Sequence, residues 1–301
     1  MHGRRTSRLV ASIVTTLALV LTGCADRSTQ SVPPAPASSS AAPVVEPSVA
    51  QSTSVAPSIE PAPQASASPS IAAGNPAKVL KGVAYRPSID PAAFTTEITN
   101  PYMPLVPGTA MTYDGGGEHS VFNITGRTKT VMGVKVIIVR DQGFEHGALI
   151  EDTEDYFAQD PVGNVWYFGE STAECAGHRI TSRAGSWQAG VDGAQPGVVM
   201  LAQPNIGDYY RQEYLRGEAE DVARVLRLDA TVKAHLGTYP NVVITEDFSR
   251  LEPTVVEHKK YAPGIGLIAE QTVGVGGVVQ LMKVDPKAGS GARTEGPLCR
   301  V

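Results

Sequence analysis

Aromatic residues are scarce in this chain and missing from its first part. Phe, Trp and Tyr make up 6% of the 301 residues, and the first of them is Tyr85. Cores depend on aromatic and branched apolar side chains, so we expect no packed core before that position. The rest of the chain is long enough for one β-sandwich or barrel-like domain, or for two small domains.

The chain also lacks an excess of basic residues and the common nucleotide and nucleophile motifs. Its formal net charge is −5 and its pI is about 5.7, which argues against a nucleic-acid partner. The sequence contains no P-loop, GxSxG elbow or GxGxxG loop. Neither a helical HxxxH pair nor a zinc-type cysteine spacing occurs. These absences favour a non-catalytic protein without a tightly bound cofactor.

The N-terminus has the pattern of an export signal. Arg4, Arg5 and Arg8 precede the uncharged segment 9–21. That segment is shorter than the ~20 apolar residues that a membrane-spanning helix needs, and it matches a signal-peptide core. The Arg4-Arg5 pair suggests twin-arginine export, but the residues after it fit that motif poorly, so the export route stays open.

The segment Leu21-Thr22-Gly23-Cys24 resembles the lipobox of bacterial lipoproteins. The resemblance implies that residues 1–23 are a cleaved signal peptide and that Cys24 becomes the acylated mature N-terminus. It also implies a lipid anchor on the extracytoplasmic face of the cell membrane, since several acyl chains hold a protein firmly. The alternative is an ordinary secretory signal that happens to end near a cysteine.

Residues 24–80 have the composition of a linker. They consist mostly of Ala, Ser, Pro, Val and Thr, with few charges. Proline removes backbone donors, and such a composition cannot offset the entropy of ordering. We predict a disordered, partly polyproline-like spacer that carries the following domain away from the membrane.

Residues 85–301 have the pattern of an antiparallel β domain. Strands are predicted at 119–125, 134–140, 149–159, 165–168, 209–215, 241–248, 254–262, 266–273 and 277–284. Glycine and proline turns separate them, including Met132-Gly133 and Asp160–Asn164. Residues 218–228 have a helix-like apolar spacing but could equally form a strand. The predicted fold is mainly β, as a sandwich or a curved half-barrel.

Three segments, 100–108, 163–170 and 257–266, resemble a group of uncharacterised exported bacterial β-proteins. The resemblance spans most of residues 93–285 and implies the fold class without implying a reaction or a site. The segments 237–243 and 261–264 are similar to parts of envelope proteins with a curved antiparallel sheet. This second resemblance concerns the fold only.

The densest group of carboxylates is Glu151, Asp152, Glu154 and Asp155. Alternation along a strand places Glu151 and Asp155 on one face. With Asp160 and Asn164 they form a candidate calcium site, and as a carboxylate pair they are candidates for acid–base catalysis. The alternative is a solvated strand that discourages edge pairing.

Two further groups of residues are candidates for structure or binding. Cys175 and Cys299 remain after Cys24 is assigned, and outside the cytoplasm they can form a disulfide or stay free. Four aromatic residues could line a ligand surface or belong to the core; they are Trp166, Tyr167, Tyr210 and Tyr261.

Three functions are consistent with these features. The first is a membrane-anchored extracytoplasmic domain that binds a ligand or a partner without catalysis. The second is a cell-envelope hydrolase that uses carboxylates between Glu151 and Asp160. The third is a structural component of an envelope assembly.

Overall fold

A computed structural model describes residues 75–79, 84–286 and 299, and every structural statement below concerns these residues. The predicted signal peptide, Cys24 and nearly all of the predicted linker lie outside them. Those assignments therefore stay predictions.

The described chain is built almost entirely from β-strands. One short 3₁₀ turn, η1 (Pro91–Ala93), precedes them. The strands are β1 (Ala110–Gly115), β2 (Glu118–Val131), β3 (Val134–Glu145), β4 (Ala148–Gln159), β5 (Val165–Ala176), β6 (Arg179–Ser182), β7 (Trp187–Gln188), β8 (Gln195–Met200), β9 (Tyr209–Arg211), β10 (Glu213–Tyr214), β11 (Asp221–Ala234), β12 (Gly237–Ser249), β13 (Val256–Ala262), β14 (Gly266–Thr272) and β15 (Val279–Asp285). This confirms the mainly β prediction. No helix in these ranges has the length and apolar character to span a membrane.

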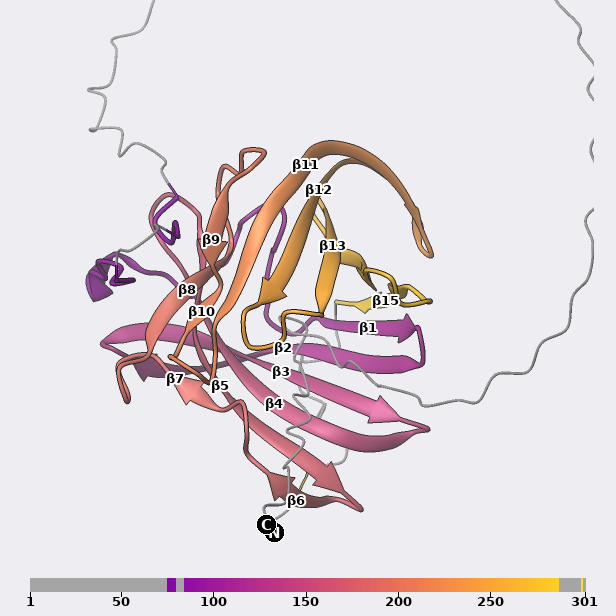
Figure 1. The fold of residues 1–301 in the computed structure, drawn as a ribbon, viewed down its shortest axis with the longest axis horizontal. Helices are drawn as coiled ribbons and strands as arrows, with labels where there is room; N and C mark the ends of the chain where they lie inside the picture. Colours follow the sequence, from indigo (N-terminus) through magenta and orange to yellow (C-terminus); the bar gives the residue numbers. More distant parts are fainter. Residues whose placement is uncertain (1–74, 80–83, 287–298, 300–301) are drawn as a thin grey trace, which may run out of the picture. The chain divides into compact units, whose positions relative to one another are not determined.

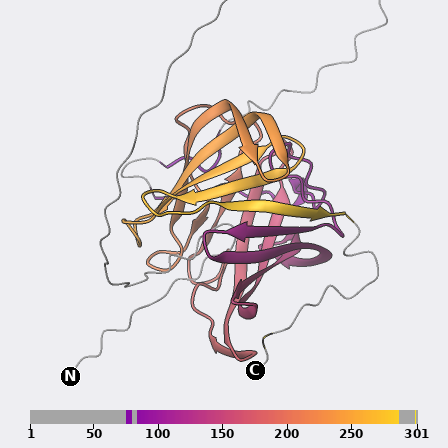
Figure 2. The ribbon, with the colours of Figure 1, turned by 90° about the vertical axis from the view of Figure 1, so that its right-hand side faces the viewer.

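The strands form one antiparallel sheet that curls on itself (Figure 1). The order along the sheet is β10-β8-β5-β4-β3-β2-β1-β15-β14-β13-β12-β11-β9, and β6 and β7 pair with β5 beside this path. Figure 2 shows β15 in yellow alongside β1 in indigo, so the last strand lies beside the first. The curved sheet is therefore a nearly closed barrel and not a two-sheet sandwich.

Segment 209–214 brings the two ends of the sheet together. Its first part, β9, pairs with β11, and its last part, β10, pairs with β8. Gln212 lies between the two, and its backbone N–H donates to Asp221 O at 2.9 Å. Gly197 of β8 permits this approach, because a Cβ there would lie 2.3 Å from the Gln212 carbonyl.

Tight turns set the register of the long hairpins. Val131 pairs with Val134, which leaves Met132 and Gly133 as a two-residue turn with positive φ at both positions. Such turns match the twist of antiparallel strands. The Asp160–Asn164 connection is held differently, since Asp160 Oδ1 accepts the backbone N–H groups of residues 162, 163 and 164. Both predicted turns are present.

The helix-like spacing in 218–228 was misleading, because residues 221–228 belong to strand β11 and residues 218–220 precede it. Ala219 forms a bridge with Leu215 before the strand begins. Residues 221–223 are buried on both faces of β11, so the apolar positions do not show the two-residue alternation of a half-buried strand. The alternative interpretation of this segment as a strand is the correct one.

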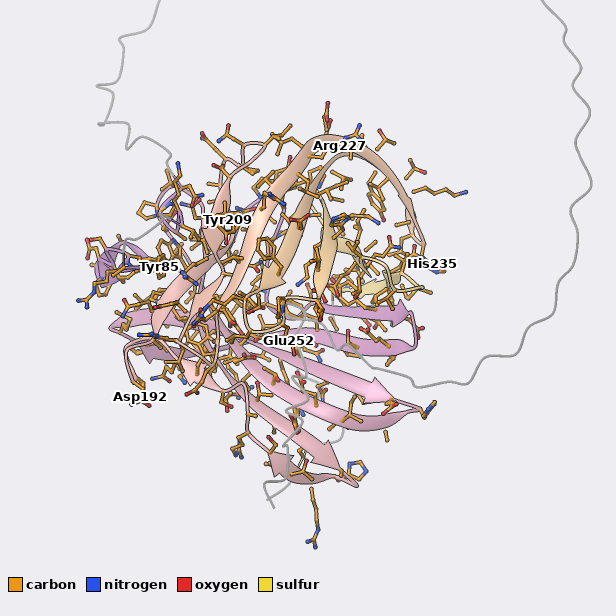
Figure 3. All side chains as sticks on the ribbon, in the orientation of Figure 1. Tyr85, Asp192, Tyr209, Arg227, His235 and Glu252 are labelled. Atoms are coloured by element: carbon orange, nitrogen blue, oxygen red, sulfur yellow. A yellow bond between two sulfur atoms is a disulfide. The ribbon has the colours of Figure 1, made fainter. Side chains whose placement is uncertain are left out.

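Apolar side chains fill one end of the space that the sheet encloses. Val139, Phe157, Tyr167 and Ile268 are among the most buried residues of this core. Phe157 stacks on Tyr167 with ring centroids 5.0 Å apart, across the β4–β5 pair. Figure 3 shows side chains filling the space between the two sides of the curved sheet.

A disulfide joins Cys175, near the end of β5, to Cys299 near the C-terminus. Their Cα atoms are 5.9 Å apart, a separation ordinary for a disulfide. The two cysteines are 124 positions apart in the sequence. A cross-link over so long a loop restricts the unfolded chain strongly.

We predict that the double substitution Cys175→Ser with Cys299→Ser lowers the free energy of unfolding by up to about 4–5 kcal/mol, the chain-entropy value for a loop of this length. Denaturant titration of the oxidised chain measures the loss, with Cys24→Ser as the matched control. Equal stability of the wild-type chain with and without a reductant would contradict this prediction.

Candidate functional site

Carboxylates from neighbouring strands line the inner face of the sheet next to the apolar core. Strand register places them on this face: Glu170 pairs with Asp155, Thr153 with Asp141, Lys259 with Glu270, and Glu257 with Asp247. We call this set the acidic interior; it consists of Asp141, Glu151, Asp155, Glu170, Glu213, Asp247, Glu257 and Glu270 together with Lys259.

Lys259 is the cation of the acidic interior. Its side chain is fully buried, and its ammonium nitrogen lies 3.5 Å from Asp247 Oδ2, 3.6 Å from Glu257 Oε2 and 3.7 Å from Glu270 Oε2. Burial by itself would lower the pKa of Lys259, but the carboxylates of Glu270, Asp247 and Glu257 together raise the pKa well above its ordinary value. Lys259 therefore stays charged and joins three strands, β12, β13 and β14.

The β4 side of the acidic interior has carboxylates without a facing cation of this kind. Asp155 Oδ1 accepts the Tyr167 hydroxyl at 2.7 Å, and Glu151 Oε1 accepts the Thr153 hydroxyl at 3.0 Å. The second oxygen of each, Asp155 Oδ2 and Glu151 Oε2, is buried without a hydrogen-bond partner. A buried carboxylate in this state favours the protonated form.

Burial and repulsion between carboxylates raise the pKa of Glu151, Asp155 and Glu118. Burial, followed by Asp141 and Glu170, raises the pKa of Glu151 well above its ordinary range. Burial, followed by Glu170 and Asp141, does the same to the pKa of Asp155. At the rim, burial and then Glu270 raise the pKa of Glu118 to about 7. Glu151 and Asp155 are therefore carboxyls that retain protons to unusually high pH.

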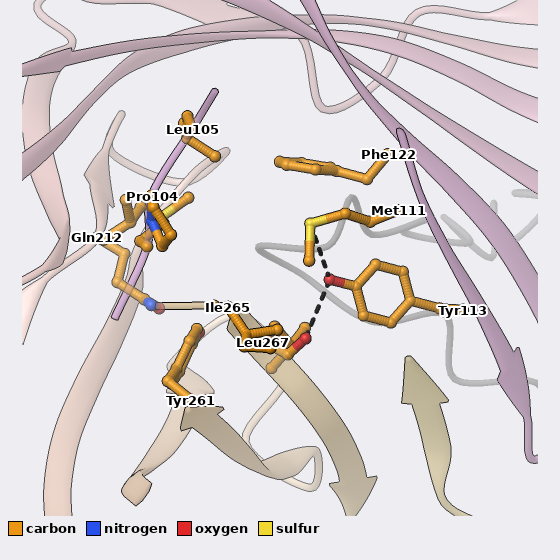
Figure 4. Close-up of a pocket in the computed structure, with 12 residues that line it drawn as sticks. Pro104, Leu105, Met111, Tyr113, Phe122, Gln212, Tyr261, Ile265 and Leu267 are labelled. Carbon is orange, nitrogen blue, oxygen red and sulfur yellow. Dashed lines mark hydrogen bonds between the residues drawn. The ribbon is translucent and has the colours of Figure 1, made fainter. Parts of the chain in front are cut away.

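An apolar pocket opens beside the acidic interior (Figure 4). Its empty volume is about 490 Å³ when space open to solvent is included, and its free cavity volume is about 30 Å³. A cavity of that size holds no more than about two water molecules. The lining residues come from the segment before β1, from β1, β2, β8, β13 and β14, from the residue between β9 and β10, and from the β13–β14 turn. They are Met103, Pro104, Leu105, Met111, Tyr113, Phe122, Val199, Gln212, Tyr261, Ile265, Gly266 and Leu267.

Three lining residues carry polar groups and lie near the acidic interior; we call Tyr113, Gln212 and Tyr261 the polar floor of the pocket. The Tyr113 hydroxyl donates to Leu267 O at 3.1 Å (Figure 4). Burial, then Asp141 and Glu270, raise the pKa of Tyr113. The pKa of Tyr261 is raised by burial and then by Asp247. Both phenols are therefore neutral.

Gln212 is the floor residue with an unsatisfied group. Its Nε2 donates to Asp247 Oδ2 at 3.0 Å, which fixes the amide so that Oε1 faces away from the carboxylate. Gln212 is 2% exposed, and its Oε1 is buried without a hydrogen-bond partner. A buried acceptor without a donor is costly, so this atom is a place where a ligand donor would be favourable.

The predicted cation ligands do not lie together. Glu151 and Asp155 share the inner face of β4, whereas Asp160 and Asn164 belong to the turn after β4. At ~3.3 Å per residue, the chain path to Asp160 is up to roughly 30 Å from Glu151 and up to roughly 16 Å from Asp155. Asp160 is engaged by Trp166 Nε1 and Asn164 Nδ2 as well as by backbone donors. Within the described ranges, no three His, Cys, Asp or Glu side chains are grouped as a metal site.

The four predicted ligand-surface aromatics have different locations. Trp166, Tyr167 and Tyr210 lie within the core and are at most 3% exposed. Tyr261 belongs to the floor of the pocket. The inner face of the sheet therefore contributes one of these rings to a cavity, and the other three support the fold.

Sequence reasoning missed Lys259 and Gln212, the residues on which the site depends most. Lys259 lies in the segment Glu257-His258-Lys259-Lys260, whose four residues are all polar. Such a segment is typical of a strand with both faces exposed to solvent. An available signal was the alternation of Glu257, Lys259 and Tyr261 on one face, since a tyrosine that is expected to be buried implies that its face-sharing neighbours are buried too.

Comparisons with known proteins show a likeness of fold. No protein family and no curated protein matches the chain. A Bacteroides fragilis protein, provisionally described as exported and with a YmcC-like fold, is similar at a TM-score of 0.37 and 13% identity. A Parabacteroides distasonis protein, provisionally described as a lipoprotein, is similar at 0.34 and 8%. Each alignment covers 61% of this chain and 98% of the other.

We predict that Glu151→Gln stabilises the protein at pH 8 by about 1–2 kcal/mol, a usual size for one buried polar group. Above the ordinary glutamate pKa of 4.5, the unfolded chain releases a proton that folded Glu151 retains. The stability that this group contributes at lower pH is therefore lost as pH rises toward the raised pKa. Glutamine keeps the bond from Thr153 and does not ionise.

Denaturant unfolding between pH 4 and pH 8 measures this effect. Glu218→Gln, at an exposed glutamate, is the matched control and should keep the wild-type pH profile. The conclusion that folded Glu151 is protonated would be contradicted if Glu151→Gln left the pH dependence of stability unchanged. It would also be contradicted if the variant were less stable than the wild type at pH 8.

Proposed function

We propose that this protein is an exported, lipid-anchored domain that binds a small apolar ligand without catalysis. In this proposal residues 1–23 are the signal peptide, Cys24 carries the lipid, residues 24–80 are the spacer and residues 85–301 are the binding domain. The segment Leu21-Thr22-Gly23-Cys24 supports the anchor. The extracytoplasmic location also agrees with the disulfide of the folded domain.

The observation that carries the binding function is the pocket with its polar floor. Ligand sites are concave and mostly apolar, with a few polar groups that orient the ligand. Here the walls are Met, Leu, Ile, Pro, Val and Phe side chains, and the floor offers the unpaired Oε1 of Gln212. This combination favours a ligand with an apolar body and one polar end.

The same lining favours binding over catalysis. Its ionisable groups are the phenols of Tyr113 and Tyr261, and burial raises the pKa of both. A neutral phenol at such a position neither accepts a proton readily nor acts as a nucleophile. Glu151 and Asp155, the carboxylates proposed for hydrolysis, are buried outside the pocket lining and are bonded to Thr153 and Tyr167.

The anchor is tested by fractionating cells that express the full chain. We expect the wild type in the membrane fraction, with a mature N-terminal cysteine whose mass includes acyl groups. Cys24→Ser should leave the protein without that added mass and should release it from the membrane. A mature wild-type chain without acyl groups would contradict the anchor.

Ligand binding is tested on the full chain with Cys24→Ser, so that no attached acyl group competes for the pocket. Neutral apolar compounds should shift the methyl NMR signals of Met103 and Met111, which line the pocket. The signal of Met132, which is 39% exposed in a distant turn, is the control. No saturable change at Met103 or Met111 would contradict the binding function.

A further inference from the structure

We propose that the pocket selects a neutral single-chain amphiphile whose terminal hydroxyl donates a hydrogen bond to Gln212 Oε1. This inference rests on the proposed binding function and names the ligand class. The terminal hydroxyl lies at the floor, and the hydrocarbon chain follows the apolar wall toward the mouth.

The small free volume of the pocket limits its ligand to one chain. The free cavity volume is about 30 Å³, so a chain enters only where the wall side chains move to make room. Met103 and Met111 are both part of the wall. Methionine side chains are flexible and adjust to apolar groups of different shape, so they allow a linear chain to enter.

The unpaired oxygen of Gln212 selects a donor. Its amide nitrogen is already used by Asp247, so the amide cannot rotate to offer a donor without breaking that bond. A ligand that has a hydroxyl satisfies Oε1, whereas an ether or an alkane of the same size leaves it buried and unpaired. Sites built for a hydrogen bond reject ligands that lack the matching group.

The acidic interior selects against charge on the ligand. A carboxylate at the floor would lie near Asp247, which is 3.0 Å from Gln212, and near the Asp141 and Glu270 groups that act on Tyr113. An ammonium group gains little in return, because Asp247 already accepts from Gln212 and Thr245 and pairs with Lys259. A neutral hydroxyl fits both conditions.

The test compares four ligands by the methyl NMR titration of the full chain with Cys24→Ser. They are 1-octanol, its ether isomer 1-methoxyheptane, octanoate and octylammonium. We expect 1-octanol to bind about tenfold more tightly than the ether, as one hydrogen bond allows. Octanoate should bind more weakly still, and octylammonium no more tightly than 1-octanol.

The variant Gln212→Met tests whether the preference for 1-octanol over the ether comes from Gln212 Oε1. This variant keeps the length of the side chain and removes the acceptor, so we expect it to bind 1-octanol and the ether equally. Gln203→Met, at an exposed glutamine, is the matched control and should keep the tenfold preference. If Gln212→Met does not fold, the comparison of alcohol with ether in the parent chain still decides.

The outcomes separate this inference from the proposed function. Equal binding of 1-octanol and the ether in the parent chain would overturn the hydroxyl assignment and leave the pocket as a binding site. Tighter binding of octanoate or octylammonium would overturn the neutral head group. If none of the four ligands shifts Met103 or Met111, the binding function fails as well.

Discussion

The buried ammonium group of Lys259 is the interaction on which the polar half of this protein depends. It lies within 3.7 Å of carboxylates from three strands, at Asp247, Glu257 and Glu270. Without it, these carboxylates would face one another in a space closed to water, where charges repel strongly. A buried ion group of this kind fixes which strands pair and how they pair, since a slip in register would leave each charge unpaired.

The ion group also sets the geometry of the pocket. Asp247 is held by Lys259, and it in turn holds the amide of Gln212, which lies at the seam where the sheet closes. Gly197 allows the backbones to meet there. The pocket therefore has a floor whose one unpaired acceptor is kept in place by charges that no ligand needs to contact. Selectivity for a hydroxyl and rejection of an anion have this single origin.

The sequence predicted the fold better than the site. β-Branched or alternating residues between turns predicted strands such as Val134–Glu145 and Ala148–Gln159. Segment 218–228 did not, because it begins before β11 and its first strand residues are buried on both faces. The alternation around Lys259 hinted that its side chain is buried, but the partners Asp247 and Glu270 of Lys259 and the partner Asp247 of Gln212 come from other segments, and only the closed sheet brings them together. The sequence identified the carboxylates of β4 as a group. Asp160 and Asn164 were added to the candidate calcium site because they are near in sequence.

The stability of Lys259→Met as a function of pH tests the role of the ion group most directly. Methionine has an unbranched side chain one atom shorter than that of lysine and carries no charge. The account predicts a loss of about 3–5 kcal/mol at pH 7, the usual cost of leaving buried charges unpaired. The loss of stability should be smaller at pH 4, because the carboxylates left without Lys259 take up protons there. Lys283→Met, at an exposed lysine, is the control and should stay near the wild type. A Lys259→Met chain as stable as that control at pH 7 would contradict the account.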